Sequence, residues 1–151
     1  ELDLLGPIHD EELRRYINQR QEETDALSYK GVLPYNEAIE VVSDCDVGLM
    51  VAHRGKSKEI SSPLKMFEYL SLGLTIIASD FEKWHDVLDE KRCALFVNPD
   101  SAEDIAEKME ILVKRKDLLI EMKENARLIS SKYSWESVQK RLVDLYISLE
   151  D

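Results

Sequence analysis

The chain has 151 residues, of which 44% are hydrophobic, and its formal net charge at pH 7 is −11. This length fits one domain or one half of a two-domain protein, and the apolar content can supply a sizeable core. The acidic charge argues against a nucleic-acid partner, because binding to phosphate backbones requires clustered lysine and arginine. No apolar run approaches the roughly 20 residues that a membrane span requires.

Strands are predicted where short apolar runs, rich in β-branched residues, end near glycine, proline or polar residues. In chain order these strands are Leu2–Leu5, Ala26–Lys30, Val47–Val51, Leu74–Ala78 and Ala94–Val97. Helices are predicted where apolar residues recur every three or four positions after a capping residue, among them Asp10, Ser101 and Ser134. They are Asp10–Gln21, Pro34–Ser43, Ser62–Leu72, Glu82–Leu88, Ala102–Lys114, Leu118–Lys132 and Trp135–Leu149.

The regular alternation of strand and helix predicts an α/β fold with a parallel, Rossmann-like sheet of about five strands. We expect helices on both faces of this sheet and a helical tail at the C-terminus. In such sheets a ligand binds beyond the carboxyl ends of the strands. This rule places four loops on one rim, namely Gly6-Pro7, Gly31–Leu33, Ala52–Pro63 and Asp80–Lys83.

The segment Ser61–Asp80, SSPLKMFEYLSLGLTIIASD, is the most informative part of the chain. It reads as a helix followed directly by a strand that is buried on both faces. Ser62 is predicted as the N-cap of this helix, with Pro63 at the first helical position. Gly73 is predicted to end the helix in a left-handed conformation.

Two charged residues of this helix point to an anionic ligand. Lys65 and Glu68 stand three residues apart, so they share one face near the helix N-terminus. A lysine in the first turn opposes the helix dipole, at a cost of about 0.3–1 kcal/mol. A bound anion would remove this conflict, because it would contact both the lysine and the free backbone N–H groups. The alternative is a surface ion pair of little energetic value.

Four segments carry a resemblance to a known family. They are KGVLPYNEAIEVVSDCDVGLM, SSPLKMFEYLSLGLTIIASD, ALFVNPDSAEDIAEKM and YSWESVQKRLVDLY. In order and spacing they resemble the C-terminal domain of family 4 (group 1) retaining glycosyltransferases of GT-B fold, from about Leu2 to Tyr146. The resemblance implies that residues 1–151 form a Rossmann-like domain that binds a nucleotide sugar. A separate acceptor-binding domain, and the first strand of this domain, would then precede Glu1.

The resemblance also implies an activity. Proteins of this family transfer a sugar from a nucleoside-diphosphate sugar to an acceptor hydroxyl and retain the anomeric configuration. We expect no cofactor and no metal, a cytoplasmic location or one at the inner face of the membrane, and a role in glycan or cell-surface polysaccharide synthesis. Any peripheral membrane association would come through the missing half. The isolated chain should bind nucleotide weakly and turn over little. The alternative is a non-catalytic or split subunit that docks on a separate acceptor-binding protein.

The family motif has two glutamates separated by seven residues, and Glu68 matches the second, which contacts the ribose. The first would fall at Ile60, one position after Glu59. This departure resembles a variant in which Ser-Pro-x-Lys precedes the glutamate and the lysine binds pyrophosphate. The implied contacts are therefore pyrophosphate on Ser62, Pro63, Leu64 and Lys65, ribose on Glu68, and a nucleobase lined by Gly31, Val32 and Leu33. The resemblance assigns no catalytic residue in this chain.

Other motifs have simpler interpretations. Asp44-Cys45-Asp46 looks like an Asp-x-Asp metal site, but that motif should follow a buried strand, and here the buried strand comes after it. We therefore expect no metal there. An ordinary turn is the alternative for Gly31–Leu33. Trp84 and Trp135 are interpreted as packing residues, and both cysteines, Cys45 and Cys93, as reduced core residues.

Overall fold

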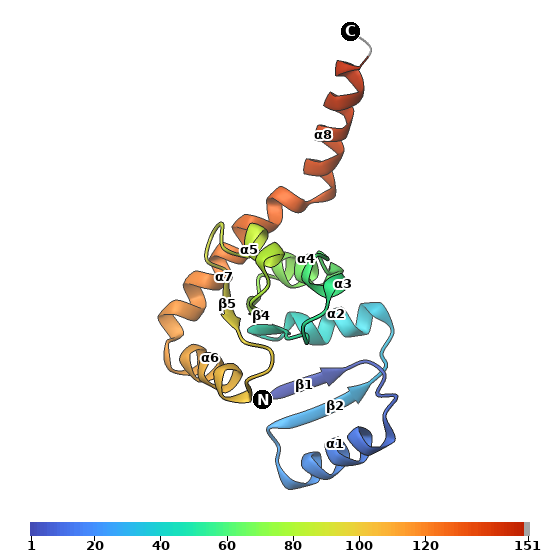
Figure 1. Cartoon of the computed structure of the whole chain (residues 1–151), viewed down its shortest axis with the longest axis vertical. Helices are drawn as coiled ribbons and strands as arrows, with labels where there is room; N and C mark the ends of the chain where they lie inside the picture. The colour runs from blue at the N-terminus through green and yellow to red at the C-terminus, as the bar shows by residue number, and fades with distance from the viewer. Residues whose placement is uncertain (150–151) are drawn as a thin grey trace. The chain divides into compact units, whose positions relative to one another are not determined.

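The computed structural model (Figure 1) describes residues 1–149, and the chain divides into two compact units. The first unit is Glu1–Val42, and the second begins at Ser43. The first contains a sheet of two strands and the second a sheet of three, and all neighbouring strands pair in parallel. The predicted α/β class with five parallel strands is confirmed, although the strands pair in two sets. Each set joins strands that are consecutive in the sequence, because a helical crossover returns the chain between them.

The first unit is a strand–helix–strand arrangement. Strand β1 (Leu2–Leu5) pairs with β2 (Leu27–Gly31), and α1 (Glu11–Glu23) connects them. Asp10 caps α1 as predicted, since its carboxylate accepts the backbone N–H of Leu13 at 2.8 Å. Further along, α2 (Tyr35–Ser43) leads toward the second unit.

The second unit is built on three strands, of which the middle one is completely buried. These are β3 (Val47–Met50), β4 (Thr75–Ser79) and β5 (Ala94–Val97), in that spatial order. Every residue of β4 is buried, as its continuous run of Thr-Ile-Ile-Ala-Ser predicts for a strand covered on both faces. Its side chains alternate between the two faces, so Ile76 and Ile77 belong to different hydrophobic clusters.

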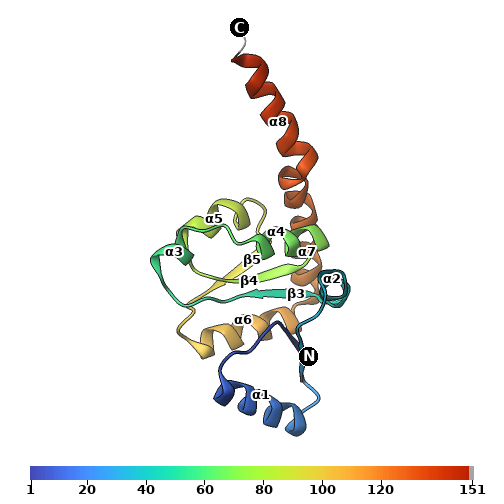
Figure 2. The ribbon, with the colours of Figure 1, turned by 90° about the vertical axis from the view of Figure 1, so that its right-hand side faces the viewer.

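Helices cover both faces of this sheet (Figure 2), which confirms the layered arrangement expected from the sequence. On one face lie α4 (Leu64–Leu72) and α5 (Glu82–Leu88), which contribute side chains to the cluster around Ile76. The other face is covered by α6 (Ala102–Lys114). A longer helix, α7 (Lys116–Ser130), contributes to both clusters, because its buried residues recur on one stripe along four turns.

Three features differ from the sequence-based expectations. The polar loop after β3 contains one helical turn, α3 (Lys56–Glu59), which is closed by Glu59 Oε1 accepting the N–H of Gly55 at 2.9 Å. After α7 the chain continues through a 3₁₀ turn, η1 (Ser131–Tyr133), into α8 (Trp135–Ser148). Trp135 is 68% exposed, so its interpretation as a packing residue is wrong. None of the helices within residues 1–149 combines the length and apolar character of a membrane span.

Candidate functional site

The N-terminus of α4 has no side-chain cap. The N-cap is Pro63, with φ −65° and ψ 139°, rather than the predicted Ser62, and Leu64 is the first helical residue. Among residues 1–149, no hydrogen-bond acceptor contacts the backbone N–H groups of Ser62, Leu64 and Lys65. The helices α1, α6 and α8, by contrast, are capped by Asp10, Ser101 and Ser134. The start of α4 is therefore a group of donors open to an anion.

Contacts in the middle and at the C-terminus fix α4 in position. Tyr69 lies against β3 at Gly48, where a Cβ atom would come within 2.7 Å of the Tyr69 Cγ. At the C-terminus Gly73 has φ 73°, as predicted, and its N–H donates to Leu70 O at 3.0 Å. The N–H of Leu74 donates to Tyr69 O, which completes a Schellman motif. The open N-terminus therefore belongs to a helix that is anchored against the sheet.

Lys65 and Glu68 form no ion pair with each other or with another residue in the described part of the chain. The surface ion pair that the sequence left as an alternative is therefore not formed. Lys65 is exposed, whereas Glu68 is half-buried one turn further along the helix. Burial raises the pKa of Tyr69, and the neighbouring charges of Cys45 and Glu68 add to this shift. A cation and a carboxylate thus stand near the open helix end with their hydrogen-bonding capacity unused.

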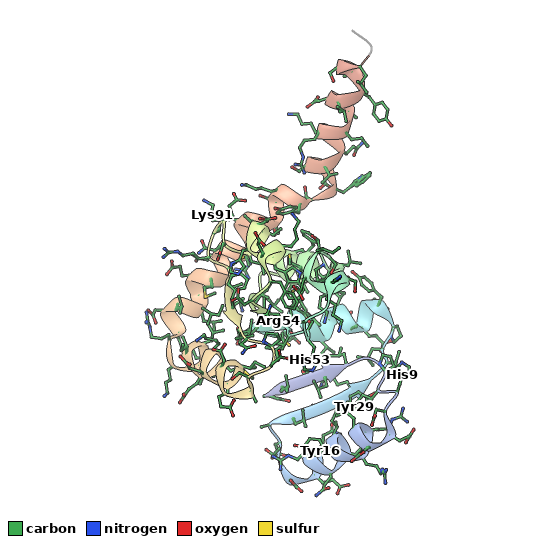
Figure 3. All side chains as sticks on the ribbon, viewed as in Figure 1. His9, Tyr16, Tyr29, His53, Arg54 and Lys91 are labelled. Carbon is green, nitrogen blue, oxygen red and sulfur yellow. The ribbon has the colours of Figure 1, made fainter. Side chains whose placement is uncertain are left out.

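The loops at the carboxyl ends of the three strands are tied to one another. The buried hydroxyl of Ser79, at the end of β4, accepts the N–H of Ala52 at 2.8 Å and donates to Ala52 O at 3.0 Å. His53 in the loop after β3 contacts Asp100 after β5, with 3.0 Å between Nδ1 and Oδ1. Arg54 lies over the Phe81 ring, with 5.9 Å from the guanidinium carbon to the ring centroid. Figure 3 labels Arg54 and His53. This rim is therefore braced by side chains from all three connections.

Two side chains of α5 make contacts that the sequence did not predict. Trp84, expected to pack, is 3% exposed, and its indole N–H also donates to Ser61 O at 2.8 Å. The His85 ring lies between two carboxylates, with Nε2 2.7 Å from Asp80 Oδ1 and Nδ1 2.6 Å from Asp89 Oδ2. The His85–Asp89 spacing of four residues could have indicated the second contact. The contacts of Trp84 with Ser61 could not be found in this way, because they join separate segments.

Burial of the His85 ring acts to lower its pKa, but the hydrogen bonds to Asp89 and Asp80 outweigh it, so the pKa of His85 lies above its ordinary value. An ionised carboxylate can only accept, so a ring that carries a proton on both nitrogens satisfies both contacts at once. The ring also stacks on Phe96, with 3.7 Å between centroids. These contacts therefore favour the protonated form of His85.

The predicted nucleobase residues belong to the first unit and are described within it. Gly31 ends β2 with φ 69°, and its carbonyl accepts the N–H of Gly6 at 2.8 Å. Val32 is 70% exposed and Leu33 is half-buried. The positive φ explains the glycine at position 31, since other residues are strained there. The three residues stand at the carboxyl end of β2, where the sequence placed them, and their role in lining a nucleobase stays a prediction.

The Asp44–Asp46 segment lies before β3, where the sequence placed it. Asp46 accepts a hydrogen bond from Lys123 Nζ at 2.7 Å, which lowers the pKa of Asp46. Among residues 1–149 no group of three His, Cys, Asp or Glu side chains is arranged to hold a metal ion. A cavity of about 360 Å³ is lined by Asp46 and by residues of α7.

Comparison with solved structures finds the same fold in other proteins. The Anabaena protein HepE, in complex with UDP, matches with a TM-score of 0.78 and 13% identity, covering 97% of this chain and 40% of that one. Its complex with UDP-glucose gives a TM-score of 0.75, 11% identity and coverages of 97% and 40%. Sucrose-phosphate synthase from Thermosynechococcus elongatus matches with a TM-score of 0.73, 18% identity and coverages of 97% and 38%. The chain thus spans about 40% of the length of these proteins.

Sequence comparison with curated proteins finds no match. A family model, described as group 1 glycosyl transferases, matches residues 1–115. This range includes both sheets and the segment around Lys65 and Glu68. It agrees with the resemblance carried by the sequence motifs and with the fold of the solved structures. The chain therefore belongs to the group 1 glycosyltransferases.

Proposed function

We propose that this chain is the donor-binding domain of a retaining glycosyltransferase, which binds a nucleoside-diphosphate sugar at the N-terminus of α4. The observation that carries the proposal is this uncapped helix end, with its open N–H groups beside Lys65 and Glu68, which form no ion pair within residues 1–149. The complexes of HepE with UDP and UDP-glucose support a nucleotide-sugar ligand for a chain of this fold.

The proposed contacts follow from the charges of Lys65 and Glu68 and from the direction of their side chains on α4. The diphosphate would lie on the N–H groups of Ser62, Leu64 and Lys65, with the Lys65 ammonium neutralising part of its charge. Pro63 has no N–H, so it shapes the turn without donating. A carboxylate in the second turn leans toward the helix N-terminus, which lets Glu68 accept from the ribose hydroxyls.

The same groups would assist the transfer itself. As the glycosidic bond to the donor breaks, negative charge builds up on the departing nucleoside diphosphate. Fixed N–H donors and an ammonium group stabilise that charge without reorganising during the reaction. Because Lys65 and the helix end supply the positive charge, we propose that the chain needs no metal for binding. The sugar then passes to an acceptor hydroxyl, with retention of configuration.

The remaining parts of the proposal concern the whole protein. We propose that an acceptor-binding domain faces this one, that the protein acts in the cytoplasm or at the inner face of the membrane, and that it contributes to glycan or surface polysaccharide synthesis. Gly31, Val32 and Leu33 are proposed to line the nucleobase. The sugar and the base of the donor are to be identified by titration with a panel of nucleoside diphosphates.

Calorimetric titration of the full chain with UDP, GDP and ADP tests the site. For the diphosphate that binds, Lys65→Ala and Glu68→Ala should each weaken binding by about ten- to a hundredfold, the value expected for a charged hydrogen bond. Lys91→Ala is the matched control, because Lys91 is exposed in the α5–β5 connection, away from the start of α4. Equal affinity of wild type and both site variants would refute the assignment.

A further inference from the structure

Trp84 connects α5 to the segment that precedes α4. Its indole Nε1–H donates to the carbonyl oxygen of Ser61 at 2.8 Å, across 23 positions of sequence. The side chain is 3% exposed and packs edge-on against Phe81, with 4.8 Å between ring centroids. The donor is therefore held by a rigid, buried ring, and its direction is set by the core of the second unit.

This hydrogen bond fixes the orientation of a neighbouring N–H group. The peptide between Ser61 and Ser62 is planar and trans, since the described chain contains no cis peptide bond. In a trans peptide the C=O and the N–H point in opposite directions. Because the Ser61 carbonyl points toward Trp84, the N–H of Ser62 points away from α5. Among residues 1–149 no acceptor forms a hydrogen bond with this N–H.

We propose that Trp84 is a positioning residue of the donor site, which orients the Ser61–Ser62 peptide so that the Ser62 N–H joins those of Leu64 and Lys65 in binding the diphosphate. This inference rests on the proposed function. Its physical basis is preorganisation: a donor that already points at the anion loses less freedom on binding. The alternative is that the Ser61 carbonyl only provides a hydrogen-bond acceptor for the buried indole N–H. In that case the hydrogen bond has no effect on ligand binding.

The variant Trp84→Phe keeps an aromatic ring in the core and removes the hydrogen bond. Calorimetric titration with UDP should show binding about three- to tenfold weaker, as the loss of one oriented donor implies. Trp135→Phe is the matched control, because Trp135 is exposed at the start of α8. This variant should bind UDP with the affinity of wild type. The thermal unfolding midpoints of both variants show whether the fold is intact. A lower affinity with an unchanged midpoint is then not caused by unfolding.

A second measurement does not depend on a ligand. The chain has two tryptophans, so Trp135→Phe leaves Trp84 as the only one. Biosynthetic replacement of Trp84 by benzothienylalanine then removes the N–H and keeps the shape of the ring. In ¹⁵N relaxation of this chain, the order parameter of the Ser62 amide should fall from about 0.85 toward 0.6, and that of Leu70 inside α4 should not change.

The outcomes separate the two proposals. Weaker UDP binding by Trp84→Phe, together with a more mobile Ser62 amide, supports the inference. Wild-type affinity in Trp84→Phe, or an unchanged Ser62 order parameter, overturns it and leaves the donor site in place. If wild type binds no nucleoside diphosphate, the proposed function fails, and with it the role of Trp84 in that site, whatever the relaxation data show.

Discussion

The ring of Tyr69 occupies the space that a side chain at Gly48 would need. A Cβ atom built on Gly48 would lie 2.6 Å from Tyr69 Cε2 and 2.7 Å from Cγ. Gly48 is the second residue of β3, and Tyr69 lies in the middle of α4, so this contact sets how closely the helix approaches the sheet. The glycine is therefore required by packing, and the helix that carries Lys65 and Glu68 is positioned by it.

Gly48→Ala should destabilise the fold by about 1–3 kcal/mol, because the added methyl group forces the Tyr69 ring or the strand to move. The free energy of unfolding in urea measures this loss. Gly55→Ala provides the control, since Gly55 has an extended φ of 171° and nothing lies within 4 Å of its added Cβ. A destabilisation of the same size in both variants would show that the Tyr69 contact is not its cause.

The stability contributed by His85 should depend on pH. The pKa of His85 in the folded chain is raised above its ordinary value of 6.5, because hydrogen bonds to Asp89 and Asp80 outweigh the effect of burial. A raised pKa means that the contribution is fully present below about pH 6.5 and is lost as pH rises through the folded-state pKa.

Comparison of wild type with His85→Gln, which has no charge at any pH, tests this dependence. The difference in their free energies of unfolding should be larger at pH 5.5 than at pH 8.5. In an Asp89→Asn background the same difference should vary less with pH, because one carboxylate acceptor is gone. A difference that grows with rising pH contradicts a raised pKa of His85.

The two cysteines should differ in reactivity. Cys93 is fully buried, and this burial raises the pKa of its thiol to about 11. At pH 8 only about one molecule in a thousand would carry the reactive thiolate. Iodoacetamide should therefore modify the native chain at Cys45, which is half-buried, and spare Cys93. Mass spectrometry of a Cys45→Ala variant should then show no modification until the chain is unfolded. Rapid native alkylation of that variant would count against a closed core.

Removal of divalent cations should leave nucleotide binding unchanged. In the proposed site the positive charge comes from Lys65 and the α4 N-terminus, so EDTA has nothing to extract. Titration with UDP in EDTA and in magnesium chloride, at equal ionic strength, makes the comparison. Affinity more than about tenfold higher with magnesium would mean that a metal shares the diphosphate, since such ions bind through phosphates and carboxylates.

Local sequence patterns were sufficient to predict most helices and strands. Asp10, Ser101 and Ser134 cap their helices as expected, because a cap needs only its own side chain and the N–H three residues on. The continuous apolar run of β4 predicted burial on both faces, since strand length and β-branching are also local properties. Gly73 has the left-handed conformation that its place after the helix required.

The arrangement of the candidate site depended on the tertiary structure. Ser62 has a side chain that can cap a helix, yet α4 begins after Pro63. The backbone N–H groups of its first turn are therefore not capped by a side chain. The contacts of Trp84 with Ser61 and of Tyr69 with Gly48 join residues separated by 21 or more positions, and no periodicity of the sequence encodes them. The sequence by itself therefore determined the order of the elements and the charges near α4. Folding decided which of those groups stay unpaired, because only packing brings distant segments together.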